Sequence, residues 1–364
     1  MKRKKHYLWP LFLLYIVTSF IWGVSTYAEE AATTESGTED PLGGFNYQVI
    51  FPENQHTKNV GYFDLMMTPG QEQTVEVQLI NDSAHEMTIN ISLNGTKTNG
   101  NGVIEYGPTD IEDDKSLKYK FTDIVTGEKK VTIPAQSLVS YYLTIKMPEA
   151  SYDGQIVGGI QMQQEVDNSK SQGGIINEYA YMIGMVLQEN ENPLEPNLEM
   201  NKVYAGLSNY RNAVFVNFSN TVADFMRDMT VDVQIMPADS DEVLYDTKKA
   251  GMEMAPNTLI NFPVTMNGDR MEPGDYKAYV LVTSGDKRWE WTENFTITDE
   301  EADKFNGQDV SLLQERTIDW KTIVALVGGA LVVILIIFVV VRIILKNKGK
   351  KKGKRKSSKK RNRK

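Results

Sequence analysis

The side chains that most often carry out catalysis are scarce in this chain of 364 residues, which has three histidines and no cysteine. His85-Glu86 begins like the zinc-binding helix of a protease, but no second histidine follows at the required spacing. No nucleophile elbow, P-loop or dinucleotide-binding glycine pattern is present. Without cysteine, disulfide bonds, thiolate catalysis and Cys-ligated metals are excluded as well. The sequence therefore predicts a binding protein that is not an enzyme, with no metal and no cofactor.

Two other groups of side chains could bind a ligand. The acidic run from Asp110 to Asp114 offers oxygen ligands to a hard cation, but its spacing differs from that of an EF-hand, so a solvated acidic loop is the preferred interpretation. Trp289-Glu-Trp291 places two indoles on one face of a strand. They could stack on a sugar, although packing against a core is favoured.

Charge divides the chain into regions. Between Glu29 and Asp319 there are 20 Lys/Arg and all 48 Asp/Glu, a net charge of −28, whereas Arg342 to Lys364 holds 14 Lys/Arg and no acid. The acidic region would repel nucleic acid, so no nucleic-acid partner is expected. An acidic, cysteine-free region of this size is typical of proteins exported by Gram-positive bacteria.

The two ends predict a single-pass membrane protein. Residues 1–28 have the basic start, apolar stretch and small residues before Ala28 of a secretory signal peptide, with an uncleaved anchor as the alternative. Residues 29–44 are expected to be a disordered lead-in. Residues 322–341 are uncharged and long enough to cross about 30 Å of hydrocarbon. The basic tail, 342–364, then predicts a cytoplasmic C-terminus and an N-terminus outside the cytoplasmic membrane.

Between these ends, hydrophobic residues recur with a period of two. Such runs, rich in β-branched and aromatic residues and bounded by Gly, Pro or Asn, predict an all-β fold of two tandem immunoglobulin-like β-sandwiches. We expect the first over 45–188, a proline-containing linker over 189–197, the second over 198–306 and a juxtamembrane segment over 307–321. The expected strands are Phe45–Phe51, Thr74–Ile80, Met87–Leu93, Val139–Met147, Gln155–Gln164, Glu178–Leu187, Leu198–Ala205, Ala213–Phe218, Thr230–Met236, Val243–Asp246, Leu259–Val264, Asp275–Val282 and Trp289–Ile297.

Segments between the expected strands have their own signals. The stretch from Asn94 to Asp114 is rich in Gly, Asn and Asp and is expected to be a long surface insertion. The polar stretch 167–174 is expected to be a mobile loop. Gly154, Gly158 and Gly159 are expected to permit tight backbone geometry or a bulge. Thr298-Asp-Glu-Glu301 is a capping box, which predicts a short helix.

Several short motifs occur in a fixed order along the predicted sandwiches. With the order of signal, two β domains, span and basic tail, they resemble the WxL-interacting proteins of low-GC Gram-positive bacteria. The first sandwich resembles the peptidoglycan-binding module of that family and the second its host-binding module. The motifs are Phe51-Pro-Glu-Asn-Gln55, Gly61-Tyr-Phe-Asp-Leu65, Pro69-Gly70, Asn101-Gly-Val-Ile-Glu-Tyr106, Met147-Pro148, Tyr152-Asp-Gly-Gln-Ile-Val-Gly-Gly159, Val203-Tyr-Ala-Gly206, Asn209-Tyr-Arg211, Met254-Ala-Pro-Asn257, Pro273-Gly-Asp-Tyr276 and Trp291-Thr-Glu-Asn-Phe-Thr-Ile297.

The resemblance implies a cell-surface adhesion and scaffolding protein held by the membrane. It would engage peptidoglycan and WxL-domain proteins, and host matrix proteins such as fibronectin or collagen. Exposed sheet edges or loops would bind these partners, for example by accepting a β-strand. Two alternatives stay open: a cell-wall-modifying hydrolase that works through paired carboxylates, and a receptor that senses the state of the wall.

Candidate binding residues come from two of the motifs. The first group could hydrogen-bond to and stack on a glycan or stem peptide, or could instead shape a turn beside core residues. The second group could form a partner-facing loop or the start of a strand. The first group is Glu53, Asn54, Gln55, Tyr62 and Asp64, and the second is Ala255, Pro256 and Asn257.

Overall fold

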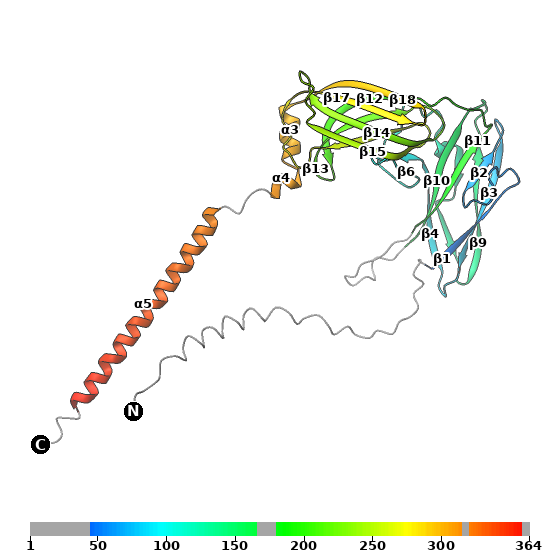
Figure 1. Cartoon of the computed structure of the whole chain (residues 1–364). Coiled ribbons are helices and arrows are strands. Elements are labelled where there is room, and N and C mark those ends of the chain that lie inside the picture. The colour runs from blue at the N-terminus through cyan, green and yellow to red at the C-terminus, as the bar shows by residue number, and fades with distance from the viewer. Residues whose placement is uncertain (1–43, 166–179, 315–319, 359–364) are drawn as a thin grey trace, which may run out of the picture. The chain divides into compact units, whose positions relative to one another are not determined.

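The computed structural model describes residues 44–165, 180–314 and 320–358. The predicted signal peptide (1–28), nearly all of the predicted lead-in (29–44) and the predicted loop (167–174) lie outside the described residues. Within those ranges the chain is mostly β, and an apolar helix follows near the C-terminus (Figure 1). The prediction of a mostly β protein with one apolar C-terminal helix is therefore confirmed.

The first part of the chain forms two sheets around one hydrophobic core. The strand orders are β1-β3-β9-β7 and β2-β11-β10-β4-β8, and β2 runs parallel to β11 at one edge. We call this part the first sandwich. Its strands are β1 (Phe45–Ile50), β2 (Phe63–Met66), β3 (Glu72–Asn81), β4 (Met87–Gly95), β7 (Val125–Gly127), β8 (Lys130–Ile133), β9 (Ser137–Lys146), β10 (Gln155–Gln164) and β11 (Ala180–Gln188).

The period-two pattern explains how this core forms. Along β3, the side chains of Val75, Val77 and Leu79 are buried while their neighbours are half-exposed or exposed, as expected where one face of a sheet covers a core. The short helix α2 (Phe121–Ile124) adds the buried ring of Phe121 beside β4 and β10. The core thus joins both sheets and α2.

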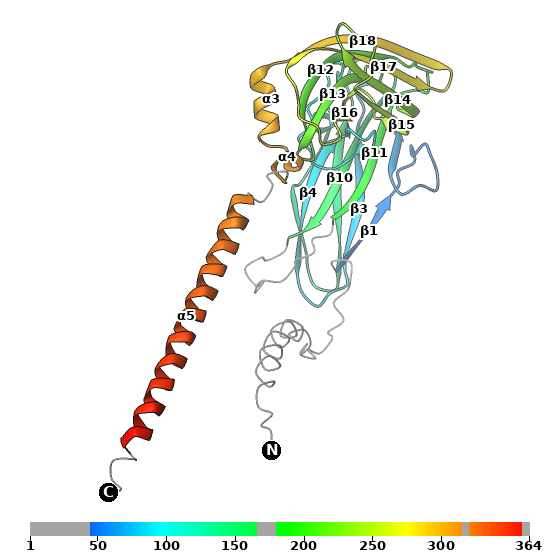
Figure 2. The ribbon, with the colours of Figure 1, turned by 60° about the vertical axis from the view of Figure 1, so that its left-hand side comes forward.

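The second part of the chain forms another pair of sheets, β12-β13-β16 and β15-β14-β17-β18, around a separate core (Figure 2). We call it the second sandwich. Trp289 and Trp291 pack against this core, and the Trp291 ring centroid lies 6.3 Å from that of Phe218, so the packing interpretation of this pair is confirmed. The strands are β12 (Leu198–Ser208), β13 (Arg211–Asn220), β14 (Met226–Pro237), β15 (Tyr245–Met254), β16 (Thr258–Thr265), β17 (Gly274–Ser284) and β18 (Lys287–Ile297).

The prediction that the stretch from Asn94 to Asp114 is a surface insertion is wrong. Residues 96–117, the junction segment, contain the small hairpin β5 (Lys97–Thr98) and β6 (Ile104–Glu105) and contact the second sandwich. The buried Thr98 hydroxyl lies 2.8 Å from the hydroxyl of Thr258 and accepts a hydrogen bond from the Ala255 N–H at 3.0 Å. Polar groups of this segment are therefore satisfied by the other sandwich instead of by water.

The end of the second sandwich leads to the apolar helix. Helix α3 (Asp299–Asn306) begins at the predicted capping box, in which Thr298 and Glu301 exchange side-chain and backbone hydrogen bonds. The short helix α4 (Val310–Gln314) and the long helix α5 (Trp320–Ser358) follow. In α5, Val324–Ile343 has a mean hydropathy of 3.3, and it is the one described helix segment that is long and apolar enough to cross a membrane.

Candidate functional site

The predicted polar cluster before β2 holds a loop in place. The Gln55 amide donates to the carbonyl oxygens of Thr57 (3.0 Å) and Tyr62 (3.1 Å), and its Oε1 accepts from the Asp64 N–H (3.2 Å). The Asp64 carboxylate accepts from the Gln188 amide at 3.0 Å. Gln55 and Asp64 are both buried. This arrangement favours the turn-shaping alternative for the two residues.

Of the other three residues in this predicted group, one is held within the loop and two face solvent. The Asn54 amide donates to the Met66 carbonyl oxygen at 2.9 Å and exchanges two hydrogen bonds with the Gln73 side chain. Glu53 and Tyr62 are exposed. Of the five residues, these two present side chains to solvent, and contact of any of the five with a ligand stays a prediction.

Tyr106 lies over a pair of glycines on the outer face of the first sandwich. Gly159 in β10 pairs directly with Gly184 in β11. A Cβ at Gly159 would lie 2.7 Å from the Tyr106 Cβ and closer still to its carbonyl oxygen, and one at Gly184 would lie 3.7 Å from its Cε1. Tyr106 therefore needs the missing side chain at Gly159, because its carbonyl oxygen and Cβ lie where a side chain at that position would be. This close approach agrees with the tight geometry predicted for that glycine.

An open cleft beside Tyr106, which we call the aromatic cleft, has a volume of about 520 Å³. The first sandwich and the junction segment supply one wall, which includes the rings of Tyr62 and Tyr106. The second sandwich supplies Phe225, Arg227 and Glu253. The remaining lining residues are Gly61, Ile104, Met182, Gly184 and Val186.

The aromatic cleft is lined by one group of each charge, Arg227 and Glu253. The Arg227 guanidinium lies over the Phe225 ring, 5.0 Å from its centroid. Burial raises the pKa of the Tyr106 phenol, Arg227 lowers it, and Tyr62 and Glu253 raise it further. Both charges therefore act on the same hydroxyl. The arrangement offers rings for stacking and one group of each charge for a polar ligand.

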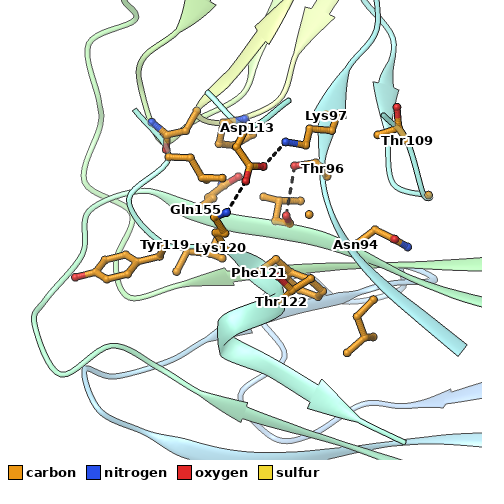
Figure 3. A pocket seen from close by; sticks show the side chains of 18 of the residues that line it. Asn94, Thr96, Lys97, Thr109, Asp113, Tyr119, Lys120, Phe121, Thr122 and Gln155 are labelled. Atoms are coloured by element: carbon orange, nitrogen blue, oxygen red, sulfur yellow. Dashed lines mark hydrogen bonds and ion pairs between the residues drawn. The ribbon is translucent and has the colours of Figure 1, made fainter. Parts of the chain in front are cut away.

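A second cavity of about 260 Å³, which we call the seam pocket, lies between the junction segment and the two sandwiches. Figure 3 shows Asp113 between Lys97 and Lys120, and its carboxylate accepts hydrogen bonds from both ammonium groups. The bond from Lys120, followed by that from Lys97, holds the pKa of Asp113 below its usual value. One side of the pocket is therefore lined by an ion triad that joins two parts of the junction segment, at Lys97 and Asp113, to Lys120 at the start of α2.

The second predicted group lies at the seam pocket. Ala255, Pro256 and Asn257 form a buried turn that leads into β16, and Pro256 and Asn257 line the pocket. The Asn257 amide donates to the Thr221 carbonyl oxygen at 3.1 Å, and its Oδ1 accepts from the Tyr152 hydroxyl at 3.3 Å. The turn therefore connects the sandwiches, which favours the alternative that it starts a strand. Partner binding by these residues stays a prediction.

The acidic run from Asp110 to Asp114 also belongs to the junction segment. Asp114 is buried and accepts hydrogen bonds from the Ser116 N–H at 2.9 Å and from the Ser219 hydroxyl. Among residues 44–165, 180–314 and 320–358, no group of three or more His, Asp or Glu is placed to hold a metal ion. The preferred interpretation, a solvated loop, is therefore wrong for Asp114, because the second sandwich covers its carboxylate.

Sequence reasoning identified Tyr62 but missed four important residues of the aromatic cleft. Tyr106 belongs to a quoted motif, yet its segment was expected to be a surface insertion. The only signal for it was the Gly158-Gly159 pair, which implies a close approach. Nothing in the sequence pattern connects Phe225, Arg227 and Glu253 to that region.

Comparisons with protein families match nearly the whole β region. The family model described as "WxL Interacting Protein, peptidoglycan binding domain" matches residues 45–164. The model described as "WxL Interacting Protein, host binding domain" matches residues 170–307. The boundary between them falls before β11, although β11 is hydrogen-bonded within the sheet of the first sandwich. A comparison with curated proteins gives no match.

Solved structures give weaker likenesses. The CsuC–CsuE chaperone–adhesion subunit complex of Acinetobacter baumannii is 13% identical and covers 64% of this chain and 94% of its own, at a TM-score of 0.28. The E. coli chaperone DraB is 10% identical and covers 68% and 96%, at 0.26. The PapD-like domain 7 of human CEP192 is 10% identical and covers 46% and 99%, at 0.26. At these scores the likenesses carry no argument about this chain.

Proposed function

This chain belongs to the WxL-interacting protein family, and we propose that it binds peptidoglycan through the aromatic cleft while its C-terminal helix holds it in the membrane. Both matched domains are described as binding domains, for peptidoglycan and for a host. The observation that carries the proposal is a cleft lined by three aromatic rings, those of Tyr62, Tyr106 and Phe225. Sugar rings present apolar faces that stack on aromatic side chains, with hydrogen bonds at their edges.

The charge of the exported region supports this mode of binding. Because its net charge is −28, the region is repelled by anionic wall polymers at long range. Stacking and short-range hydrogen bonds would therefore have to supply the affinity. A hydrolase is less well supported, because glycoside hydrolysis generally uses two carboxylates, whereas Glu253 is the only carboxylate among the described residues that line the cleft.

The binding site can be tested with aromatic variants of the full chain in detergent micelles. We expect Tyr62→Ala and Tyr106→Ala each to weaken co-sedimentation with purified peptidoglycan about fivefold, because each removes a stacking ring worth about 1 kcal/mol. Tyr142→Ala is the matched control, since Tyr142 is 55% exposed on β9 and does not line the cleft.

Tyr106→Ala could disturb the fold of the first sandwich. Tyr62→Ala still tests the site in that case, because the Tyr62 side chain is exposed. Binding by Tyr62→Ala that equals that of the unchanged chain, in protein with an unchanged thermal transition, would remove the aromatic cleft as the site.

We also propose that WxL-domain proteins bind the exported region, by a sheet edge or loop, and that the basic tail lies in the cytoplasm. Host matrix proteins such as fibronectin or collagen are further expected partners. A membrane-impermeant, amine-reactive crosslinker on intact cells should join exported lysines such as Lys202 and Lys287 to a WxL-domain protein. It should leave lysines after Arg342 unmodified unless the cells are lysed. Modification of the tail in intact cells would reverse the topology, and crosslinks that lack any WxL-domain protein would count against this partner.

A further inference from the structure

We propose that the aromatic cleft recognises the peptide part of peptidoglycan, with Arg227 binding a carboxylate and Glu253 binding an ammonium group of a zwitterionic stem peptide. This inference rests on the proposed function and specifies its ligand. It also assigns the charged half of a peptidoglycan site to the second sandwich, which lies outside the residues matched by the peptidoglycan-binding model.

Arg227 is presented in a form suited to a carboxylate. Its guanidinium is exposed and rests on the Phe225 ring at 5.0 Å, which limits the orientations of its plane. Its carbonyl oxygen accepts a hydrogen bond from the Ser284 hydroxyl at 2.7 Å, which ties the backbone to β17. A planar guanidinium held in this way can bind a carboxylate through two parallel hydrogen bonds.

The backbone of Glu253 is also fixed by a hydrogen bond, and its side chain belongs to the wall that the second sandwich supplies. It lies in β15, and its N–H donates to the Gly102 carbonyl oxygen of the junction segment at 2.9 Å. Its side chain is half-buried and lines the cleft. An ammonium group that enters the cleft would find this carboxylate already partly desolvated, which strengthens the attraction.

The two charges, those of Arg227 and Glu253, form no ion pair with each other or with another side chain of the described residues. Elsewhere in the same sheet, opposite charges are paired, as for Lys248 and Asp232, whose Nζ and Oδ2 atoms are 2.9 Å apart. Two unpaired charges of opposite sign beside three aromatic rings fit a ligand that carries both charges and an apolar stem.

Peptidoglycan contains such a ligand in only one of its two parts. Its glycan strand consists of N-acetylated sugars, whose rings could stack on tyrosines but offer no ammonium group. Stem peptides carry free carboxylates and, on the diamino residue, a free amine. Truncating one partner of a close charge pair at an interface usually costs tenfold or more in affinity. The aromatic cleft should therefore distinguish a muropeptide from a bare glycan by at least about that factor.

The proposal can be tested by calorimetric titration of the full chain in detergent with three probes. The first is a disaccharide–tetrapeptide with a free side-chain amine, the second is the same muropeptide after N-acetylation of that amine, and the third is a chitooligosaccharide. We expect the first to bind about tenfold more tightly than each of the others. Glu253→Gln should weaken the first probe about tenfold and should remove the difference between the first two. Arg227→Gln should weaken both muropeptides.

The controls are Arg211→Gln and Glu242→Gln, which change exposed charges outside the aromatic cleft. Equal affinity for the muropeptide and the chitooligosaccharide, with both reduced by Tyr62→Ala, would overturn the peptide assignment and leave the cleft as a glycan site. The assignment also fails if acetylation and Glu253→Gln weaken binding independently, because the amine would then lie elsewhere. Binding of no probe and of no intact peptidoglycan would overturn the proposed function itself.

Discussion

A single methyl group added at Gly158 is expected to lower the free energy of unfolding of the first sandwich by about 3 kcal/mol. A Cβ there would lie 2.5 Å from Cδ2 of Phe121 and closer to Cγ and Cδ1. The Phe121 side chain is 2% exposed and is enclosed by α2, β4 and β10, so its ring cannot turn away without displacing the core. Denaturant unfolding of Gly158→Ala should show the loss as a lower midpoint at an unchanged slope.

Gly184→Ala is the matched control for this prediction. Gly184 lies in the adjacent strand of the same sheet, but a Cβ there would lie 3.5 Å from the nearest atom, an ordinary contact. The loss of unfolding free energy caused by Gly184→Ala should be much smaller than that caused by Gly158→Ala. Combining Gly158→Ala with Phe121→Leu should recover part of the loss, because the two changes act on one contact. Strict additivity of the two losses would show that the Phe121 ring is not the obstacle.

The second large effect is expected at Asp309, whose carboxylate is fully buried where the chain leaves the second sandwich. Its Oδ2 accepts from the Asn212 N–H at 2.7 Å, and its Oδ1 accepts from the N–H groups of Ser311 (2.7 Å) and Leu312 (3.3 Å). Burial opposes ionisation, but these hydrogen bonds outweigh it and hold the pKa of Asp309 below its usual value. Asp309→Ala should therefore cost about 3 kcal/mol of unfolding free energy at pH 7, because three donors lose their acceptor.

The depressed pKa of Asp309 makes this stabilisation dependent on pH. The contribution is fully present above the unfolded pKa of about 4 and is lost as the pH falls through the lower folded pKa. The difference in unfolding free energy between the unchanged chain and Asp309→Asn should therefore shrink on acidification below about pH 4. Asp239→Asn, at an exposed position, is the control. A difference that stays constant down to pH 3 would contradict the ionised, hydrogen-bonded carboxylate.

Most of the strands could be predicted because one face of each is buried. Strand β10 was predicted with its observed bounds, Gln155–Gln164. The short strands β2, β5, β6, β7 and β8, each of two to four residues, were not predicted, and β15 was misplaced. The four residues of β2 lie at a sheet edge, and three of them are buried in succession, so they show no alternation. Strand β15 was expected over Val243–Asp246 and lies over Tyr245–Met254. It is an edge strand whose lysines and glycine hide the period-two pattern.

The junction and the aromatic cleft could not be predicted for a different reason. Local composition tells whether a segment is polar, and it does not tell whether water or another part of the chain satisfies its hydrogen bonds. Thr98 and Thr258 are 160 positions apart, yet their hydroxyl groups are in contact. In the same way, Tyr62 carried a signal as a ring near a turn, whereas Arg227 and Glu253 acquire their importance only from the residues that the fold brings near them.

The position of β11 has a practical consequence for work on separate halves of this protein. In its sheet β11 lies between β2 and β10, although the boundary of the matched families places it with the second half. A recombinant fragment that stops at residue 164 would expose two rows of unpaired amide and carbonyl groups. Such bare edges recruit strands from neighbouring molecules. Co-sedimentation of that fragment with insoluble peptidoglycan would then measure its self-association as well as its binding. A fragment that ends after Gln188 keeps β11 and avoids this problem.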